Sequence, residues 1–187
     1  KGQIKVSGYP VRELTRDSLR RNFGMVLQET WLKAGTIREN IAYGKPDATL
    51  EEVMEAAKHA HAHSFIKRMP NGYDTVISEG GGNISGGQKK RIAVARALIR
   101  DCDTLLIDEM TSSLDIETTD EMVKLILSLS CTVIMITHDI FDSYMDGFSA
   151  IYYIENGGIA ESGTYQRLLE QNGNFAKMQA MMKITNK

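Results

Sequence analysis

The sequence predicts an α/β fold in which a parallel sheet forms the core and a helical segment is inserted into it. Two continuous apolar runs, at residues 104–108 and 131–137, have the length of strands, and the residues between them show helical spacing. Runs without polar alternation indicate strands of a parallel sheet that is covered on both faces. Helix signals dominate residues 28–100, so we expect residues 1–27 and 101–187 to build the core around this insert.

Residues 1–27 predict two strands of the core. Residues 3–6 resemble a short strand, and the turn residues Ser7-Gly8-Tyr9-Pro10 follow it. Residues 23–28 form a second run, which ends in the polar Gln28. An amide at a strand end can join the shell of a Mg²⁺ ion and serve as a hinge, although such a residue more commonly only faces solvent.

Three capping-box patterns predict the helices of the insert. In each pattern a Ser or Thr is followed three residues later by Glu or Gln. The pairs are Thr36 with Glu39, Thr49 with Glu52, and Ser85 with Gln88. We expect the three helices to run to about residues 42, 60 and 100, with a further helix at 62–69 that Pro70 ends.

The C-terminal part continues the alternation of helices and strands. Apolar residues at helical spacing predict a helix over 116–129, and the run at 131–137 leads to His138. A glycine turn within residues 151–160 predicts a hairpin. Residues 165–182 predict two short helices that are broken at Asn172-Gly173.

Two adjacent carboxylates, Asp108 and Glu109, end the apolar run at 104–108. Ligands of open parallel sheets lie at the carboxyl ends of the strands, where Asp108 can hold Mg²⁺ directly or through water. Glu109 can then orient or deprotonate a water that attacks a γ-phosphate. An isolated strand-end acid more commonly caps the next helix. His138 ends the following run and can contact the same phosphate, although a lone strand-end His is more commonly structural.

The segment Ser85-Gly86-Gly87-Gln88 opens a helix with two glycines. Exposed N–H groups and the helix dipole make a helix N-terminus an anion site, and glycines let a phosphate approach the backbone closely. Ser85 can both cap the helix and contact the phosphate. The alternative is an ordinary capped helix, which the four residues alone do not exclude.

Composition excludes several classes of function. The 22 basic and 24 acidic residues are well mixed and give a net charge of −2. The chain therefore has no positive electrostatic field that would attract nucleic acid and no polybasic membrane anchor. No apolar run approaches the roughly twenty residues that span a bilayer. Cys102 and Cys131 lack metal spacing and indicate reduced thiols. His59 and His63 lie four residues apart in an expected helix, but no third metal ligand accompanies this pair and His61.

The order of these motifs resembles the nucleotide-binding domain of ABC transporters over essentially the whole chain. The matching segments, in chain order, are Gln28 for the Q-loop, Ile84 to Gln88 for the signature motif, Leu105 to Asp108 for Walker B, Glu109 for the catalytic glutamate, Ser112 to Asp115 for the D-loop, and His138 for the switch histidine. Residues 28–32, 35–41 and 74–81 resemble the exporter class, in which this domain usually follows a transmembrane domain in one polypeptide.

The resemblance implies a P-loop NTPase-like (RecA-like) fold and two such domains, identical or different, that associate head to tail with ATP and Mg²⁺ between them. Residues 85–88 would act on the nucleotide that the partner domain holds, and Asp115 would also bind nucleotide. Asp108 and Gln28 would hold Mg²⁺, partly through water, while Glu109 and His138 would be catalytic.

The same resemblance implies that the regions around Trp31 and Glu79 contact the transmembrane domain, on the cytoplasmic side of the cell membrane. Met110 and Asp139 depart from the usual family residues without removing a catalytic group. Residues 2–8 resemble the segment that follows the P-loop helix, so we expect the N-terminal part of the domain, with its Walker A P-loop, upstream of Lys1.

The chain alone is therefore expected to bind ATP weakly and to hydrolyse it negligibly. One alternative is a non-enzymatic interaction fragment that supplies its signature motif to a partner. Another is a soluble ABC-type ATPase of the chromosome-maintenance or DNA-repair kind. Those proteins interrupt the domain with coiled coils, whereas the segment between Gln28 and Ser85 shows no sustained heptads.

Overall fold

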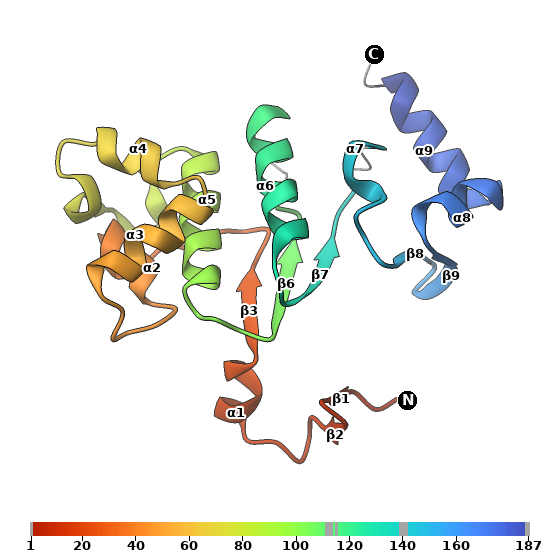
Figure 1. The fold of residues 1–187 in the computed structure, drawn as a ribbon, viewed down its shortest axis with the longest axis horizontal. Coiled ribbons are helices and arrows are strands. Elements are labelled where there is room, and N and C mark those ends of the chain that lie inside the picture. The colour runs from red at the N-terminus through yellow and green to blue at the C-terminus, as the bar shows by residue number, and fades with distance from the viewer. Residues whose placement is uncertain (1, 111–113, 115, 139–141, 186–187) are drawn as a thin grey trace. The chain divides into compact units, whose positions relative to one another are not determined.

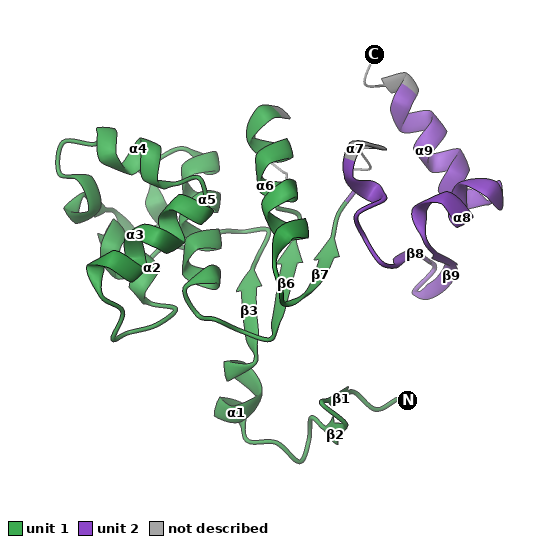
Figure 2. Ribbon diagram, viewed as in Figure 1, with its two compact units in different colours: residues 1–137 green, residues 138–187 purple. Residues whose placement is uncertain are grey.

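The computed structural model describes residues 2–110, 114, 116–138 and 142–185 (Figure 1). The chain forms two compact units, residues 1–137 and residues 138–187 (Figure 2). The first unit contains a parallel sheet and a group of helices, and the second contains a hairpin and short helices.

The sheet of the first unit has three strands, β3 (Phe23–Val26), β6 (Thr104–Asp108) and β7 (Thr132–Ile136). Their order is β3-β6-β7 and both pairings are parallel, which confirms the predicted parallel sheet. Because the three strands run in one direction, their carboxyl ends lie along one edge (Figure 1).

The two faces of this sheet differ in burial. Val26, Leu105 and Ile107 lie on one face and are almost fully buried. On the other face, Met25, Leu106 and Ile134 are neighbours on adjacent strands. Their side chains are not fully covered, and Met25 and Ile134 are 55% and 53% exposed. The described residues therefore do not cover both faces, in contrast to the prediction. An apolar run indicates that a strand can be buried on both sides, but it does not indicate whether the chain supplies both layers.

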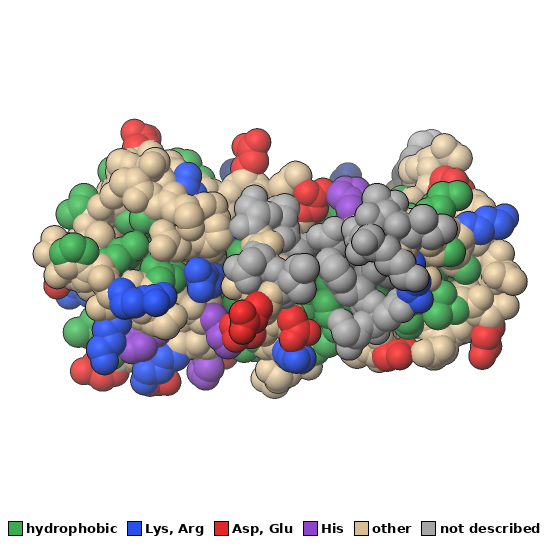
Figure 3. All heavy atoms as spheres, turned by 90° about the horizontal axis from the view of Figure 1, so that it is seen from above, with side chains coloured by type: hydrophobic (Ala, Val, Ile, Leu, Met, Phe, Trp, Pro, Cys, Tyr) green, Lys and Arg blue, Asp and Glu red, His purple; other side chains and the backbone are tan. Residues whose placement is uncertain are grey.

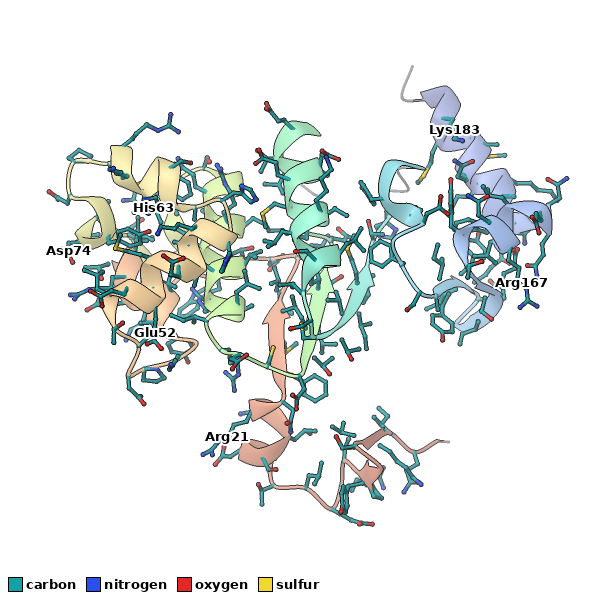
Figure 4. The ribbon with its side chains drawn as sticks, in the orientation of Figure 1. Arg21, Glu52, His63, Asp74, Arg167 and Lys183 are labelled. Carbon is teal, nitrogen blue, oxygen red and sulfur yellow. The ribbon has the colours of Figure 1, made fainter. Side chains whose placement is uncertain are left out.

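The helical part follows β3. Its elements are β4 (Gly35–Thr36), α2 (Ile37–Ala42), α3 (Leu50–His59), α4 (His63–Arg68), η1 (Gly72–Asp74), β5 (Val76–Ile77), η2 (Glu79–Gly81) and α5 (Gly86–Leu98). All three predicted capping boxes are present, at the starts of α2, α3 and α5. In the box of α3, Glu52 also pairs with Lys45, and Figure 4 shows Glu52 on this part together with His63 and Asp74.

Helix α5 joins the helical part to the sheet. It packs against α2 and α3 on one side and against β3 on another, and Figure 1 shows it between them. Arg96 of α5 donates hydrogen bonds to the backbone oxygen of Asn40 at 2.9 Å and to that of Trp31 at 3.1 Å. Asn40 is only 2% exposed, and its Oδ1 accepts a further bond from Arg96 at 3.1 Å. The helix is thus fixed on several sides, which explains why its sequence lacks a single apolar stripe.

The first unit also contains an element that the sequence did not predict. Helix α1 (Arg16–Arg21) begins after Thr15, whose side chain accepts a bond from the backbone N–H of Ser18. It buries no residue, so it has no apolar periodicity by which it could be recognised. The predicted strand at 3–6 is shorter, because β1 (Lys5–Val6) pairs with β2 (Tyr9–Pro10) across the expected turn. Helix α6 (Ile116–Ser128) lies between β6 and β7 in the chain, as predicted.

The three histidines of the helical part do not share one helix. Helix α3 ends at His59 and α4 begins at His63, because His61 between them has a left-handed backbone with φ of 50°. His63 Nδ1 lies 2.8 Å from the hydroxyl of Tyr73, and His61 Nδ1 lies 3.2 Å from Glu121 Oε2. The expectation that His59 and His63 share one helix is therefore wrong, and residues with defined positions contain no cluster of three metal-ligating side chains.

The second unit contains α7 (Asp142–Met145), the hairpin of β8 (Ile151–Glu155) and β9 (Gly158–Gly163), α8 (Tyr165–Glu170) and α9 (Asn174–Thr185). The predicted hairpin and the pair of helices broken near Gly173 are confirmed. Tyr165 and Phe175 pack edge to face in its core, with ring centroids 6.1 Å apart.

The surface carries mixed charge. Figure 3 shows Lys and Arg side chains interspersed with Asp, Glu and His over the helical part, at its left. Within the described ranges, no helix is long and apolar enough to cross a membrane.

Candidate functional site

Asp108 and Glu109 lie at the carboxyl edge of the sheet. Asp108 is the last residue of β6. Glu109 follows with a left-handed backbone, φ 47°, and its N–H donates to the backbone oxygen of Ile136 at 2.9 Å. A non-glycine residue adopts this conformation at a cost, and such strain is typical of functional sites. The left-handed conformation of Glu109 turns the chain out of the direction of β6 directly after Asp108. The next residue, Met110, is fully buried and anchors this turn.

Gln28 contacts one member of this pair, Glu109. It lies two residues beyond β3, and its Nε2 donates a hydrogen bond to Glu109 Oε2 at 2.5 Å. The two residues are 81 positions apart in the chain. They meet because β3 and β6 are parallel neighbours, so their carboxyl ends reach the same edge.

Lys90, which the sequence motifs did not single out, completes this cluster. It lies in α5, is only 3% exposed, and its Nζ donates to the backbone oxygen of Gln28 at 3.0 Å. Burial lowers the pKa of Lys90, while the charges of Glu109 and then Asp108 raise it. A signal was available, because Lys90 shares helical spacing with the buried Ala93, Val94 and Ala97. A lysine on the buried side of a helix indicates a buried partner.

The segment Ser85-Gly86-Gly87-Gln88 forms the start of α5. Ser85 Oγ accepts from the N–H of Gln88 at 3.2 Å, and Gln88 Oε1 accepts from the N–H of Ser85 at 3.1 Å. Ser85 and Gly86 are exposed, whereas Gly87 and Gln88 are half-buried. The first turn of α5 therefore presents backbone N–H groups and the positive end of a helix dipole at an open surface.

The other residues predicted for this site are Asp115 and His138. Asp115, with Ser112 and Ser113, lies outside the described residues, as does Asp139. His138 is exposed and begins the second unit, so its approach to Glu109 stays a prediction.

Trp31 and Glu79 were predicted to contact a membrane domain. Trp31 is 54% exposed in the segment after Gln28, and its backbone oxygen is held by Arg96. Glu79 is exposed in η2, and the next residue, Gly80, donates its N–H to the backbone oxygen of Leu32 at 3.0 Å. The two exposed side chains thus belong to segments that are hydrogen-bonded to each other.

The donor atoms at the sheet edge fit a nucleotide-bound Mg²⁺ ion. Asp108 offers a carboxylate, and Gln28 keeps its amide oxygen while its Nε2 binds Glu109. Mg²⁺ prefers oxygen ligands and commonly takes only one or two from the protein, with phosphate and water as the rest. Such a site needs no cluster of three carboxylates.

Comparison with known proteins agrees with this geometry. The family model described as ABC transporter matches residues 1–112. The uncharacterized ABC transporter ATP-binding protein YfiB of Bacillus subtilis (strain 168) is 44% identical over 91% of this chain and 30% of its own length. The ATP-dependent lipid A-core flippase of Desulfotalea psychrophila is 43% identical over 93% of this chain and 30% of its own.

A solved structure gives the same result. The structure of a bacterial Atm1-family ABC exporter with ATP bound superposes with a TM-score of 0.93 and 37% identity, over 98% of this chain and 32% of that one. The chain thus spans about a third of the length of these relatives. Its parallel sheet, with Gln28 and Glu109 in contact at one edge, agrees with the P-loop NTPase-like fold that the sequence predicted. The chain therefore belongs to the ABC transporter family, as a nucleotide-binding domain of the exporter class.

Proposed function

We propose that this chain forms part of the ATPase of an ABC exporter, which couples ATP hydrolysis between two head-to-tail domains to movement of a substrate across a membrane. The observation that carries the proposal is the contact of Gln28 with Glu109 beside the strand-end Asp108. The division into an α/β core at 1–27 and 101–187 and a helical subdomain at 28–100 is part of this proposal.

Hydrolysis depends on how the chain places a water molecule. Glu109 accepts a proton from the attacking water or orients it, and Gln28 holds the Glu109 carboxylate in position through its Nε2. Asp108 and the amide oxygen of Gln28 would hold Mg²⁺, partly through water, and a bound ion would supply positive charge beside the phosphate oxygens. His138 serves as the second catalytic residue.

A second nucleotide-binding domain, identical or different, supplies the other half of each site. Ser85, Gly86, Gly87 and Gln88 contact the nucleotide of that partner, and Asp115 takes part at the same interface. The exposure of Ser85 and Gly86 at the start of α5 supports this role. The backbone N–H groups of Gly86 and Gly87 can stabilise the negative charge of a phosphate without any cationic side chain, because the capping box uses those of Ser85 and Gln88.

Contact with the membrane domain uses the exposed Trp31 and the region of Glu79, on the cytoplasmic side of the cell membrane. Support comes from Arg96, which ties the Trp31 backbone to α5. A movement of α5 would therefore carry the Trp31 segment with it. This is the mechanical link between nucleotide and transport that the proposal requires.

The isolated chain is a separate case. Its sequence contains no Gly-x-x-x-x-Gly-Lys-Ser/Thr loop to cradle the β- and γ-phosphates, so we expect negligible ATP turnover from it. Its signature segment can still complement a partner domain that has such a loop. An increase in the ATPase rate of that partner on addition of the chain would establish this second role.

The test uses the full protein that carries this chain, reconstituted in lipid. Glu109→Gln removes the proton acceptor and keeps its shape, so we expect a loss of about 10²-fold or more in ATP turnover with ATP binding retained. Glu55→Gln, at an exposed position in α3, is the control and should keep the parent rate. Unchanged turnover in Glu109→Gln would contradict the proposal.

A further inference from the structure

Lys90 is the most deeply buried cation among the described residues, and its position needs a reason. It is 3% exposed, although a lysine side chain is rarely buried unless it has a partner. Its Nζ donates to the backbone oxygen of Gln28 at 3.0 Å. Gln28 in turn donates its side-chain amide to Glu109. A chain of two hydrogen bonds therefore joins Lys90 to the carboxylate that we propose as the proton acceptor.

Two other cations of the same helix show what a purely structural role looks like. Arg96 binds the backbone oxygens of Asn40 and Trp31. Arg91 binds the backbone oxygen of His61 at 3.2 Å and stacks over Phe65. Both cations tie α5 to neighbouring segments of the helical part. Lys90 instead points to the edge of the sheet, where the charges of Glu109 and Asp108 act on it.

We infer that Lys90 is a positioning residue for hydrolysis, which fixes the backbone of Gln28 and, with its charge, holds the Glu109 carboxylate against the Gln28 side chain. This inference rests on the proposed ATPase function and adds a residue to it. In this role Lys90 acts through Gln28 and Glu109 and not on the substrate itself.

The location of Lys90 in α5 gives the role a second consequence. Helix α5 begins at Gly86, so Lys90 lies about one turn after the helix start and two residues after Gln88, the last residue of the segment proposed to face the partner's nucleotide. The first turn of α5 thus begins at the exposed anion site and ends at the buried Lys90 ammonium. A displacement of the helix start moves the Lys90 Nζ and, with it, the Gln28 backbone. Lys90 therefore connects the site that α5 completes in the partner to the Glu109 site of its own chain.

The first measurement is steady-state ATP turnover of the full protein in lipid, with parent, Lys90→Met, Lys90→Arg and Lys90→Gln compared. Lys90→Met fills the space without donor or charge, so we expect kcat to fall roughly 10- to 100-fold while KM for ATP changes little. Lys90→Gln keeps a donor without the charge and should give an intermediate kcat. Lys90→Arg keeps both and should recover most of the rate.

The second measurement does not depend on turnover. Hydrogen exchange followed by mass spectrometry should show faster exchange of backbone amides around residues 28–31 in Lys90→Met, because the Gln28 carbonyl is released. Arg91→Met is the matched control, since it removes a neighbouring cation that also binds a backbone oxygen. We expect it to lower thermal stability and leave kcat within about twofold of the parent, because Arg91 contacts the His61 turn and Phe65.

Three outcomes would overturn the inference. The first is a Lys90→Met protein with the parent kcat. The second is a loss of rate that Lys90→Arg does not recover and that a matching loss of thermal stability explains. The third is an unchanged exchange pattern at residues 28–31. A parent protein without ATP turnover would instead reject the proposed function, and the Lys90 role with it.

Discussion

The side-chain amide of Gln28 donates a hydrogen bond to the carboxylate of Glu109 at 2.5 Å, across 81 residues of sequence. One partner follows β3 and the other follows β6, so the contact reports the parallel pairing of these strands. Glu109 also has a left-handed backbone, and Lys90 holds the backbone of Gln28. The carboxylate is therefore held by the Gln28 side chain, whose own backbone is held by Lys90.

Replacement of Gln28 tests that contact directly. Gln28→Ala removes the donor to Glu109, and we expect a roughly 10- to 100-fold loss of kcat in the full protein because the carboxylate loses its position. Gln28→Glu adds a negative charge beside Glu109 and should be at least as harmful. Gln171→Ala, at an exposed position after α8, is the control. A Gln28→Ala protein with parent kcat would show that the contact does not matter for hydrolysis.

Substitutions at the N-caps of α5 and α3 distinguish an effect on stability from an effect on ATP turnover. Ser85→Ala and Thr49→Ala each remove a side chain that accepts a bond from the third residue of its helix. Both should lower the free energy of unfolding by about 1 kcal/mol, as urea titrations can measure. Only Ser85→Ala should also reduce ATP turnover, because Ser85 lies at the proposed anion site. Equal loss of turnover in both variants would argue against a direct role of Ser85.

The left-handed backbone of Glu109 predicts that glycine is tolerated better than alanine at this position, the reverse of their order within a helix. Glu109→Gly and Glu109→Ala both lose the contact to Gln28, but only alanine keeps a Cβ in the strained conformation. Glu109→Gly should therefore be more stable than Glu109→Ala by about 1 kcal/mol in thermal or urea unfolding. At Glu55, within α3, the order should reverse, because glycine is the poorer helix former. The same order at both positions would mean that Glu109 is not strained.

Tyr73 predicts a loss of stability in alkali. Burial, with the charge of Glu55 as a second cause, raises the pKa of Tyr73 from 10.0 to about 12. The folded state thus favours the neutral phenol, which lies 2.8 Å from His63 Nδ1. The contribution of the neutral Tyr73 phenol to the free energy of unfolding is complete below pH 10 and is lost as the pH rises through about 12. Urea unfolding over this range should show a steeper decline for the parent than for Tyr73→Phe, and equal slopes would contradict the shift.

The sequence by itself determined the elements whose signals are local. The capping boxes at Thr36, Thr49 and Ser85 specify helix starts because each bond joins residues only three positions apart. The apolar run at 104–108 specified β6 and placed Asp108 at its end for a similar local reason. The order of the motifs was enough to indicate the family and to name Gln28 and Glu109 as candidates.

Tertiary structure decided what depends on distant parts of the chain. The Gln28–Glu109 bond needs the pairing of β3 with β6, and the burial of Lys90 needs α5 to pack against β3. The break between His59 and His63 depends on the left-handed turn at His61, for which the sequence carries no glycine signal. The open face at Met25 and Ile134 follows from which layers the chain supplies, not from the apolar character of its strands. A pattern along the chain specifies the helix or strand in which a residue lies. The residues that it contacts are specified only when distant strands and helices pack together.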